Sequence, residues 1–146
     1  ADITFEDDAD HSSEWKDAFP LNAIKSNEQA HDGTYSAKFA FTGAAGELGT
    51  ILHAAPARNP WILPQGCKKV GVWLYTDKES DSLLFSAASS SFGAYDVFSN
   101  VTVNLKQGWN YVEADVADGI TQIVQYSLYT IGGTSAVYMD SISFIK

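Results

Sequence analysis

The chain has 146 residues, of which 45% are hydrophobic, 13% aromatic and 18% charged, so it can bury one sizeable core without disulfides. Its formal net charge of −9, from 9 Lys and Arg against 18 Asp and Glu, repels phosphate backbones and anionic lipid surfaces. We therefore expect residues 1–146 to form a single monomeric domain with neither nucleic acid nor membrane as a partner. The one cysteine, Cys67, excludes an internal disulfide, and no apolar run approaches the about 20 residues of a membrane-spanning helix.

Apolar residues alternate with period two along most of the chain, which is the pattern of half-buried β-strands. Phe39 and Phe41, for example, share one face of such a segment, while Lys38 lies on the other. No segment keeps a helical period for more than about two turns. The expected strands are Ile3–Glu6, Thr34–Thr42, Gly49–His53, Lys69–Thr76, Ser82–Ala88, Tyr95–Leu105, Trp109–Val116, Ile123–Ile131 and Ala136–Ile145.

Turn-forming pairs such as Asp32-Gly33, Gln107-Gly108 and Gly132-Gly133 separate these strands. Short strands in one domain, without an internal repeat, predict an all-β fold: a two-sheet antiparallel β-sandwich or jelly roll. A closed lipocalin-type barrel is the alternative. The residues expected in the core are Phe39, Phe41, Val70, Val72, Leu74, Val112 and Ile142.

The C-terminal strand carries a first candidate site. Its apolar positions step by three residues between Met139 and Ile142, which predicts a β-bulge at Asp140. The first and last strands of a sandwich commonly lie close together, so Glu6 and Asp8 could converge with Asp140 on a structural Ca²⁺, which needs six to eight oxygen ligands. Alternatively, these acids are separate solvated or turn-capping residues.

A second candidate site combines rings with polar groups. Trp73 and Tyr75 share one face of their strand, and Gln125 and Tyr129 alternate away from the apolar face of theirs. Flat rings beside amides and hydroxyls suit a sugar, which stacks its C–H face on a ring and needs partners for its hydroxyls. We expect the four side chains to form one ligand platform. The alternatives are a second hydrophobic layer under a loop, or the opposite strand phase.

Two loops could form a wall beside this platform. Trp61 lies in a connection stiffened by three prolines, and a Trp on a rigid loop can contact a ligand at low entropic cost; alternatively it caps the core. The segment Ser89–Tyr95 is the other wall, with Tyr95 as a binding residue. The i, i+2 carboxylates Glu113 and Asp115 could serve glycoside hydrolysis, but an exposed polar strand face explains them equally well.

Several short motifs, in their order and spacing, resemble the β-jelly-roll carbohydrate-binding modules of plant-polysaccharide-degrading enzymes. The similarity spans nearly the whole chain. The motifs are Phe5-Glu6-Asp7, His31-Asp-Gly-Thr-Tyr-Ser-Ala-Lys-Phe39, Val70-Gly-Val-Trp-Leu-Tyr75, Gly108-Trp-Asn-Tyr-Val112 and Val137-Tyr-Met-Asp-Ser-Ile-Ser-Phe144.

This resemblance implies a structural calcium ion held by Glu6 and Asp140 with carbonyls of the region 33–36, although Ser141 stands where many relatives have a second Asp. It implies a ligand groove on the concave sheet. The expected function is non-catalytic binding of a plant cell-wall polysaccharide of the β-glucan, xyloglucan or mannan type, by a secreted or cell-surface module that targets an appended catalytic domain. The alternatives are a small jelly-roll glycoside hydrolase or polysaccharide lyase, and a cell-surface adhesion domain.

Overall fold

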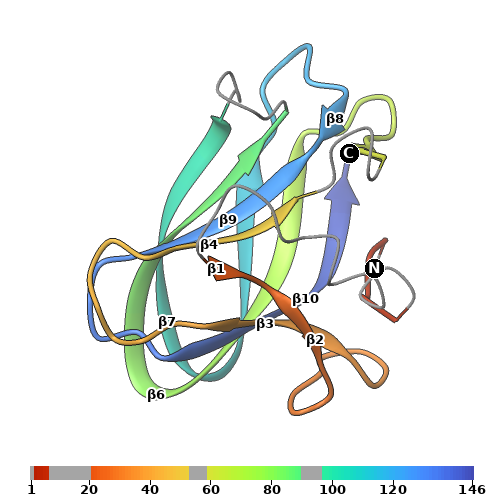
Figure 1. Ribbon diagram of the computed structural model, residues 1–146. Helices are drawn as coiled ribbons and strands as arrows, with labels where there is room; N and C mark the ends of the chain where they lie inside the picture. The colour runs from red at the N-terminus through yellow and green to blue at the C-terminus, as the bar shows by residue number, and fades with distance from the viewer. Residues whose placement is uncertain (1, 7–20, 53–58, 90–96) are drawn as a thin grey trace.

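The computed structural model describes residues 2–6, 21–52, 59–89 and 97–146, and within them it contains β-strands and no helix (Figure 1). No helix in these ranges is therefore long and apolar enough to span a membrane. The strands are β1 (Leu21–Asn22), β2 (Ile24–Ser26), β3 (Ser36–Ala40), β4 (Leu48–Leu52), β5 (Trp61–Ile62), β6 (Lys69–Ala88), β7 (Val97–Asp115), β8 (Gln122–Ile123), β9 (Gln125–Thr130) and β10 (Ala136–Ile145).

The long strands β6 and β7 form an antiparallel hairpin that runs through both layers of a sandwich. The first part of β6 pairs with β10, which continues to β3 and β2; we call this the β10 layer. The second part of β6 pairs with β9, which continues to β4 and β1; this is the β9 layer. The prediction of an all-β, two-layer antiparallel sandwich is thus confirmed.

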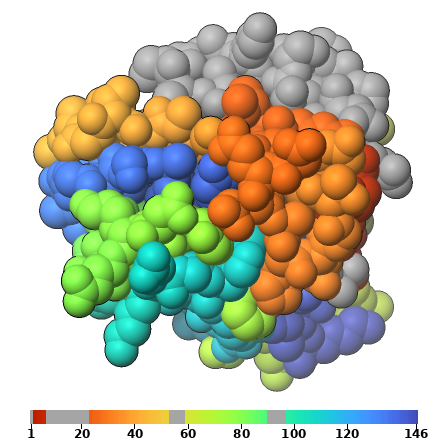
Figure 2. Space-filling view, turned by 90° about the horizontal axis from the view of Figure 1, so that it is seen from below, coloured from red at the N-terminus to blue at the C-terminus, as the bar shows by residue number. Residues whose placement is uncertain are grey.

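The pair Gln107-Gly108 is not the turn that the sequence indicates. It lies inside β7, at the place where the register between β6 and β7 shifts between Thr76 and Ser80 and the hairpin bends. Gly108 has φ 100°, which a residue with a side chain rarely adopts, and beside it residues 77–79 of β6 oppose the single residue Gln107 of β7, which makes a bulge on β6. Consequently the four strands expected between Lys69 and Val116 are two. Figure 2 views this end of the molecule, where the green and teal segments lie side by side.

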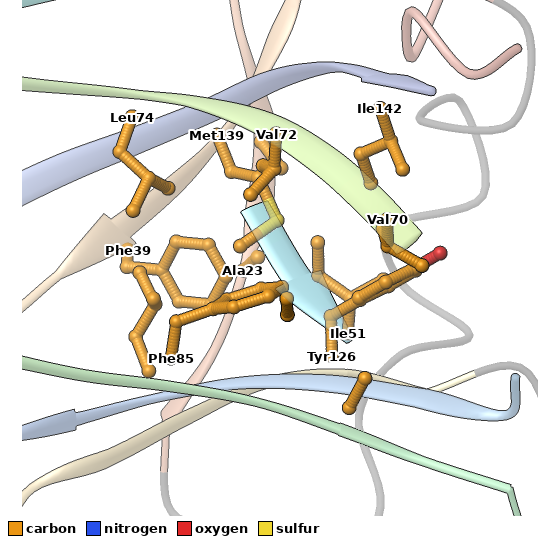
Figure 3. Packing of buried hydrophobic residues seen from close by; sticks show 14 of the residues in the cluster. Ala23, Phe39, Ile51, Val70, Val72, Leu74, Phe85, Tyr126, Met139 and Ile142 are labelled. Carbon is orange, nitrogen blue, oxygen red and sulfur yellow. The ribbon is translucent and has the colours of Figure 1, made fainter. Parts of the chain in front are cut away.

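The core fills the space between the two layers (Figure 3). Residues of β6 and β10, such as Val72 and Met139, meet Phe85 and Tyr126 from the β9 layer, and all four are fully buried. Burying such side chains stabilises the fold by about 1.5–3 kcal/mol each. Six of the seven predicted core residues are buried, and Val112 packs against them partly exposed.

The two ends of the chain meet as predicted, but with less regular pairing. The β-bulge at Asp140 is confirmed: the register shifts between Asp140 and Ser143, and Ser141 has φ 53°. The strand expected at Ile3–Glu6 is wrong, because Ile3 makes only a single bridge, to Ile142. The N-terminal segment is thus fastened beside the bulge by one backbone bridge.

Candidate functional site

The expected single platform of Trp73, Tyr75, Gln125 and Tyr129 is wrong. Trp73 and Tyr75 lie on the outer side of the β10 layer, whereas Gln125 and Tyr129 lie on the outer side of the β9 layer. The reason is the bend in β6, since outward positions before and after it point to opposite sides of the sandwich. The structure therefore places these four residues on two separate faces.

The outer side of the β9 layer carries one row of short polar side chains across four strands. Thr50 of β4, Ser127 of β9, Ser86 of β6 and Asn100 of β7 are successive partners in one row. The next row holds Leu48, Tyr129, Leu84 and Thr102, and Gln125 follows on the other side of Ser127. We call this surface the polar face.

Gln125 has the most unusual environment on the polar face. Its side chain is 2% exposed, and its Nε2 donates to Ser127 Oγ at 2.8 Å. Its Oε1 is buried and has no hydrogen-bond partner in the part of the chain that the structure describes. A buried acceptor without a donor costs about 1–3 kcal/mol, so this oxygen would gain from a hydroxyl or water that reaches it.

Tyr129 supplies the exposed ring of the polar face. It is 44% exposed and lies beside Leu84 of β6 and Leu48 of β4. A sugar ring could stack on this tyrosine while its hydroxyls reach the neighbouring row of Ser86 and Asn100.

The outer side of the β10 layer carries a cluster of rings, which we call the aromatic face: His31, Trp73, Tyr75, Trp109, Tyr111 and Tyr138. The imidazole of His31 stacks on the indole of Trp73, with centroids 4.1 Å apart and planes at 18°. Tyr75 packs edge-on between Trp109 and Tyr138. Trp73 is thus covered by His31 on one face, while Tyr111 remains 45% exposed.

The two residues expected as groove walls do not provide one. Trp61 is 8% exposed and packs in the core, with its ring centroid 4.9 Å from that of Tyr126, so its role as a wall is wrong and it caps the core instead. Tyr95, like most of the segment Ser89–Tyr95, lies outside the described residues.

Glu6 and Asp140 meet at the loop of residues 31–36. Asp140 is fully buried and accepts three backbone N–H bonds, from His31 at 2.9 Å, Asp32 at 3.1 Å and Ser141 at 2.7 Å. Glu6 Oε1 accepts the N–H groups of the loop residues 34 and 35 at 2.5 and 3.2 Å. The loop is therefore held from both ends of the chain.

The expected calcium ion stays a prediction at this place. Calcium needs six to eight oxygen ligands, and here both oxygens of Asp140 and one of Glu6 accept N–H bonds from the loop. Within the described residues, no three acidic, His or Cys side chains gather as metal ligands, and Asp8 lies outside that part of the chain. Burial raises the pKa of the Asp140 carboxyl to about 6, more than its N–H bonds lower it.

The carboxylates Glu113 and Asp115 of β7 form ion pairs with Lys69 of β6. Lys69 Nζ lies 3.8 Å from Glu113 Oε1 and 3.5 Å from Asp115 Oδ1. All three side chains are exposed, so these ion pairs contribute little stability, about 0–1 kcal/mol each. An exposed polar strand face accounts for both acids.

Sequence reasoning missed several residues of the two faces. Ser86, Asn100 and Thr102 look like ordinary solvated positions until the pairing of β6, β7 and β9 aligns them. Tyr111 shares its strand face with Glu113 and Asp115, so the sequence gives it the pattern of a solvated face. The feature that could have indicated it is Gly71 on the neighbouring strand, which leaves room for a ring.

No family model matches the sequence, and a search of curated proteins finds no significant match. Solved structures do match, and most of those described are carbohydrate-binding modules. The xylan-binding domain CBM22-1 of Xyn10C from Paenibacillus barcinonensis has a TM-score of 0.60 at 15% identity, covering 99% of this chain and 92% of that one.

Two further solved structures that match are described by different functions. The family 11 carbohydrate-binding module from Clostridium thermocellum, in complex with a β-1,3-1,4-mixed-linked tetrasaccharide, has a TM-score of 0.54 at 11% identity and covers 89% and 85% of the two chains. The K2 cleaved adhesin domain of Lys-gingipain has a TM-score of 0.64 at 14% identity, covering 99% and 96%. The fold is thus that of the β-jelly-roll carbohydrate-binding modules.

Proposed function

We propose that the protein is a non-catalytic carbohydrate-binding module that holds a polysaccharide on its polar face. The observation that carries this proposal is Gln125, whose buried Oε1 has no donor among the described residues and which lies beside the polar row of Ser127, Ser86 and Asn100. A sugar hydroxyl is the donor that such an oxygen needs. The jelly-roll fold shared with modules that bind xylan and mixed-linked glucan supports the same function.

The charge of the chain narrows the ligand. A net charge of −9 disfavours acidic polysaccharides such as pectins, so we propose a neutral plant cell-wall chain of the β-glucan, xyloglucan or mannan type. The exposed part of the polar face, at Tyr129, Asn100 and Thr102, suits internal stretches of a chain better than chain ends. The parent protein would be secreted or displayed at a cell surface and would carry a catalytic domain that this module, as a monomer, brings to the polymer.

Ring contact should supply most of the affinity. Hydrogen bonds to sugar hydroxyls replace bonds to water and gain only about 0.5–1.5 kcal/mol each, whereas burying ring surface gains about 25 cal/mol per Å². Loss of the Tyr129 ring should therefore weaken binding more than loss of the Gln125 amide.

Affinity electrophoresis in gels that contain xyloglucan, mixed-linkage glucan, mannan, xylan or pectin tests the proposal. We expect retardation by at least one neutral polymer without release of reducing ends. Tyr129→Ala should weaken binding about tenfold or more, which is about 1.4 kcal/mol, and Gln125→Ala less. The matched control is Ile24→Ala, which removes an equally exposed apolar side chain from β2 of the other layer. Release of reducing ends would point to an enzyme. Equal loss of binding in Tyr129→Ala and in the control Ile24→Ala would refute the polar face as the binding site.

A cell-surface adhesion domain is the second candidate, because the similar adhesin domain of Lys-gingipain shares the fold over nearly the whole chain. Its ligand would be a protein, so a chain that binds no polymer of the panel but retains a protein partner favours this function.

Calcium stays a prediction, separate from polysaccharide binding. If Glu6 and Asp140 hold the ion with Asp8, the melting temperature of the metal-free protein rises on adding Ca²⁺, by an amount that Glu6→Gln removes. At about 100-fold saturation, an ion that binds only the folded state adds about 2.7 kcal/mol. An unchanged melting temperature would mean that hydrogen bonds, and not a calcium ion, connect Glu6 and Asp140 to the loop 31–36.

A further inference from the structure

We infer that the aromatic face is a second glycan-binding surface, on the opposite side of the sandwich from the polar face, with the ring of Tyr111 as its stacking platform. The inference goes beyond the proposed function, since it needs no ligand on the polar face.

Tyr111 lies flat on the sheet. A Cβ atom added at Gly71 would fall 2.8 Å from Cε1 and Cζ of Tyr111 and closer still to its Oη, so the ring covers the backbone of the glycine directly. Gly71 is on β6, and its neighbour Trp73 pairs with Tyr111 across to β7. One face of the Tyr111 ring therefore rests on the sheet, and 45% of the residue is exposed to solvent.

The neighbouring rings extend this platform and fix its shape. The Trp73 and Tyr111 centroids are 5.3 Å apart with the planes tilted by 49°. Trp73 is in turn clamped under His31, and Tyr138 is buried, so these two rings support the surface rather than present it. Tyr111, with the partly exposed Trp109 and Tyr75, is what a ligand would meet.

The rim of the aromatic face offers acceptors. Tyr111 Oη donates to Glu113 Oε2 at 2.8 Å, and Tyr75 Oη donates to Asp77 Oδ1 at 2.9 Å. Burial, and after it the hydrogen bond to Glu113, raises the pKa of the Tyr111 hydroxyl. Ring faces flanked by carboxylates match the C–H faces and hydroxyl donors of a sugar.

Charge decides between the possible occupants. The acids at the rim, within a chain of net charge −9, would repel a second copy of this chain, an anionic polysaccharide or a membrane surface. A neutral glycan meets no such repulsion. Because the two faces lie on opposite sides of the sandwich, one molecule could bridge two polymer chains.

The experiment uses soluble mixed-linkage β-glucan and xyloglucan as probes, with affinity electrophoresis and turbidity as readouts. We expect Tyr111→Ala and Tyr129→Ala each to keep part of the retardation, and the double variant to lose it. Turbidity from bridged chains should appear only when both faces are intact. Gly71→Ala should act like Tyr111→Ala, because the added methyl lifts the ring, whereas Tyr111→Phe keeps the ring and should bind within about threefold of wild type.

The nuclear magnetic resonance signals of the Trp73 and Trp109 indole N–H groups give an independent readout. These signals should shift when glucan is added to the Tyr129→Ala variant. Unchanged signals, or unchanged retardation of Tyr129→Ala on adding Tyr111→Ala, would overturn the aromatic face and leave the polar face standing. Conversely, Tyr111→Ala could lose all retardation while Tyr129→Ala keeps the retardation of wild type. That result would support the aromatic face and refute the polar face. Melting temperatures of all variants exclude unfolding as the cause.

Discussion

The carboxyl group of Asp140 should make the metal-free protein less stable as the pH rises. The group is fully buried, and burial raises its pKa from 3.8 to about 6 in the folded state. Between these values the folded state holds a proton that the unfolded state has released, so the free energy of unfolding falls as the pH increases. A shift of about two pKa units at 1.36 kcal/mol per unit corresponds to about 3 kcal/mol.

The variant Asp140→Asn isolates this effect, since it keeps the shape of the side chain and removes its titration. We expect urea unfolding in excess chelator to show the variant gaining about 3 kcal/mol relative to wild type between about pH 4 and pH 7. The pKa of the neighbouring Asp32 is lowered by its hydrogen bonds to Ser141 and His31, so its contribution lies at lower pH. A difference that stays constant with pH, or has the opposite sign, would refute the reasoning, and the opposite sign would indicate that a cation stabilises the ionised carboxylate.

Three further outcomes follow from the packing. Tyr126→Phe should keep or raise the free energy of unfolding, by up to about 1 kcal/mol, because it removes a buried hydroxyl that has no hydrogen-bond partner among the described residues; a loss above about 1 kcal/mol in urea unfolding would contradict this. Trp61→Ala should destabilise the protein by about 3–5 kcal/mol and leave glucan affinity of the folded fraction unchanged, as measured by calorimetry; a selective loss of affinity would restore Trp61 as a ligand residue. Gly49→Ala should destabilise by about 1–3 kcal/mol, because its Cβ would meet Phe39 at 2.6 Å in the core, and an unchanged unfolding midpoint would show that the rings move freely.

The period-two pattern was sufficient to predict the fold class and the core, because each strand buries one of its two faces. Val70, Val72 and Leu74 were assigned to the core on that basis and are fully buried. The step of three residues after Met139 likewise predicted the bulge that carries Asp140.

The grouping of the ligand residues could not be predicted from alternation alone. Alternation tells which residues of one strand share a side, but not which layer that strand belongs to. Because the β6–β7 hairpin bends at the register shift beside Gly108 and neither strand ends there, Trp73 and Tyr129 come to lie on opposite sides of the sandwich. Trp61 was misplaced for a similar reason, since nothing in a proline-rich connection tells whether its ring turns toward the core.

Isothermal titration of wild type, Tyr129→Ala and Gln125→Ala with the neutral glucan that retards the wild type most strongly tests the central claim most directly. The account predicts binding in the micromolar to submillimolar range, about −5 to −8 kcal/mol, without release of sugar. Tyr129→Ala should lose about tenfold or more at its high-affinity site, and Gln125→Ala less, with melting temperatures close to wild type. Wild-type affinity in both variants would contradict the polar face as the binding site.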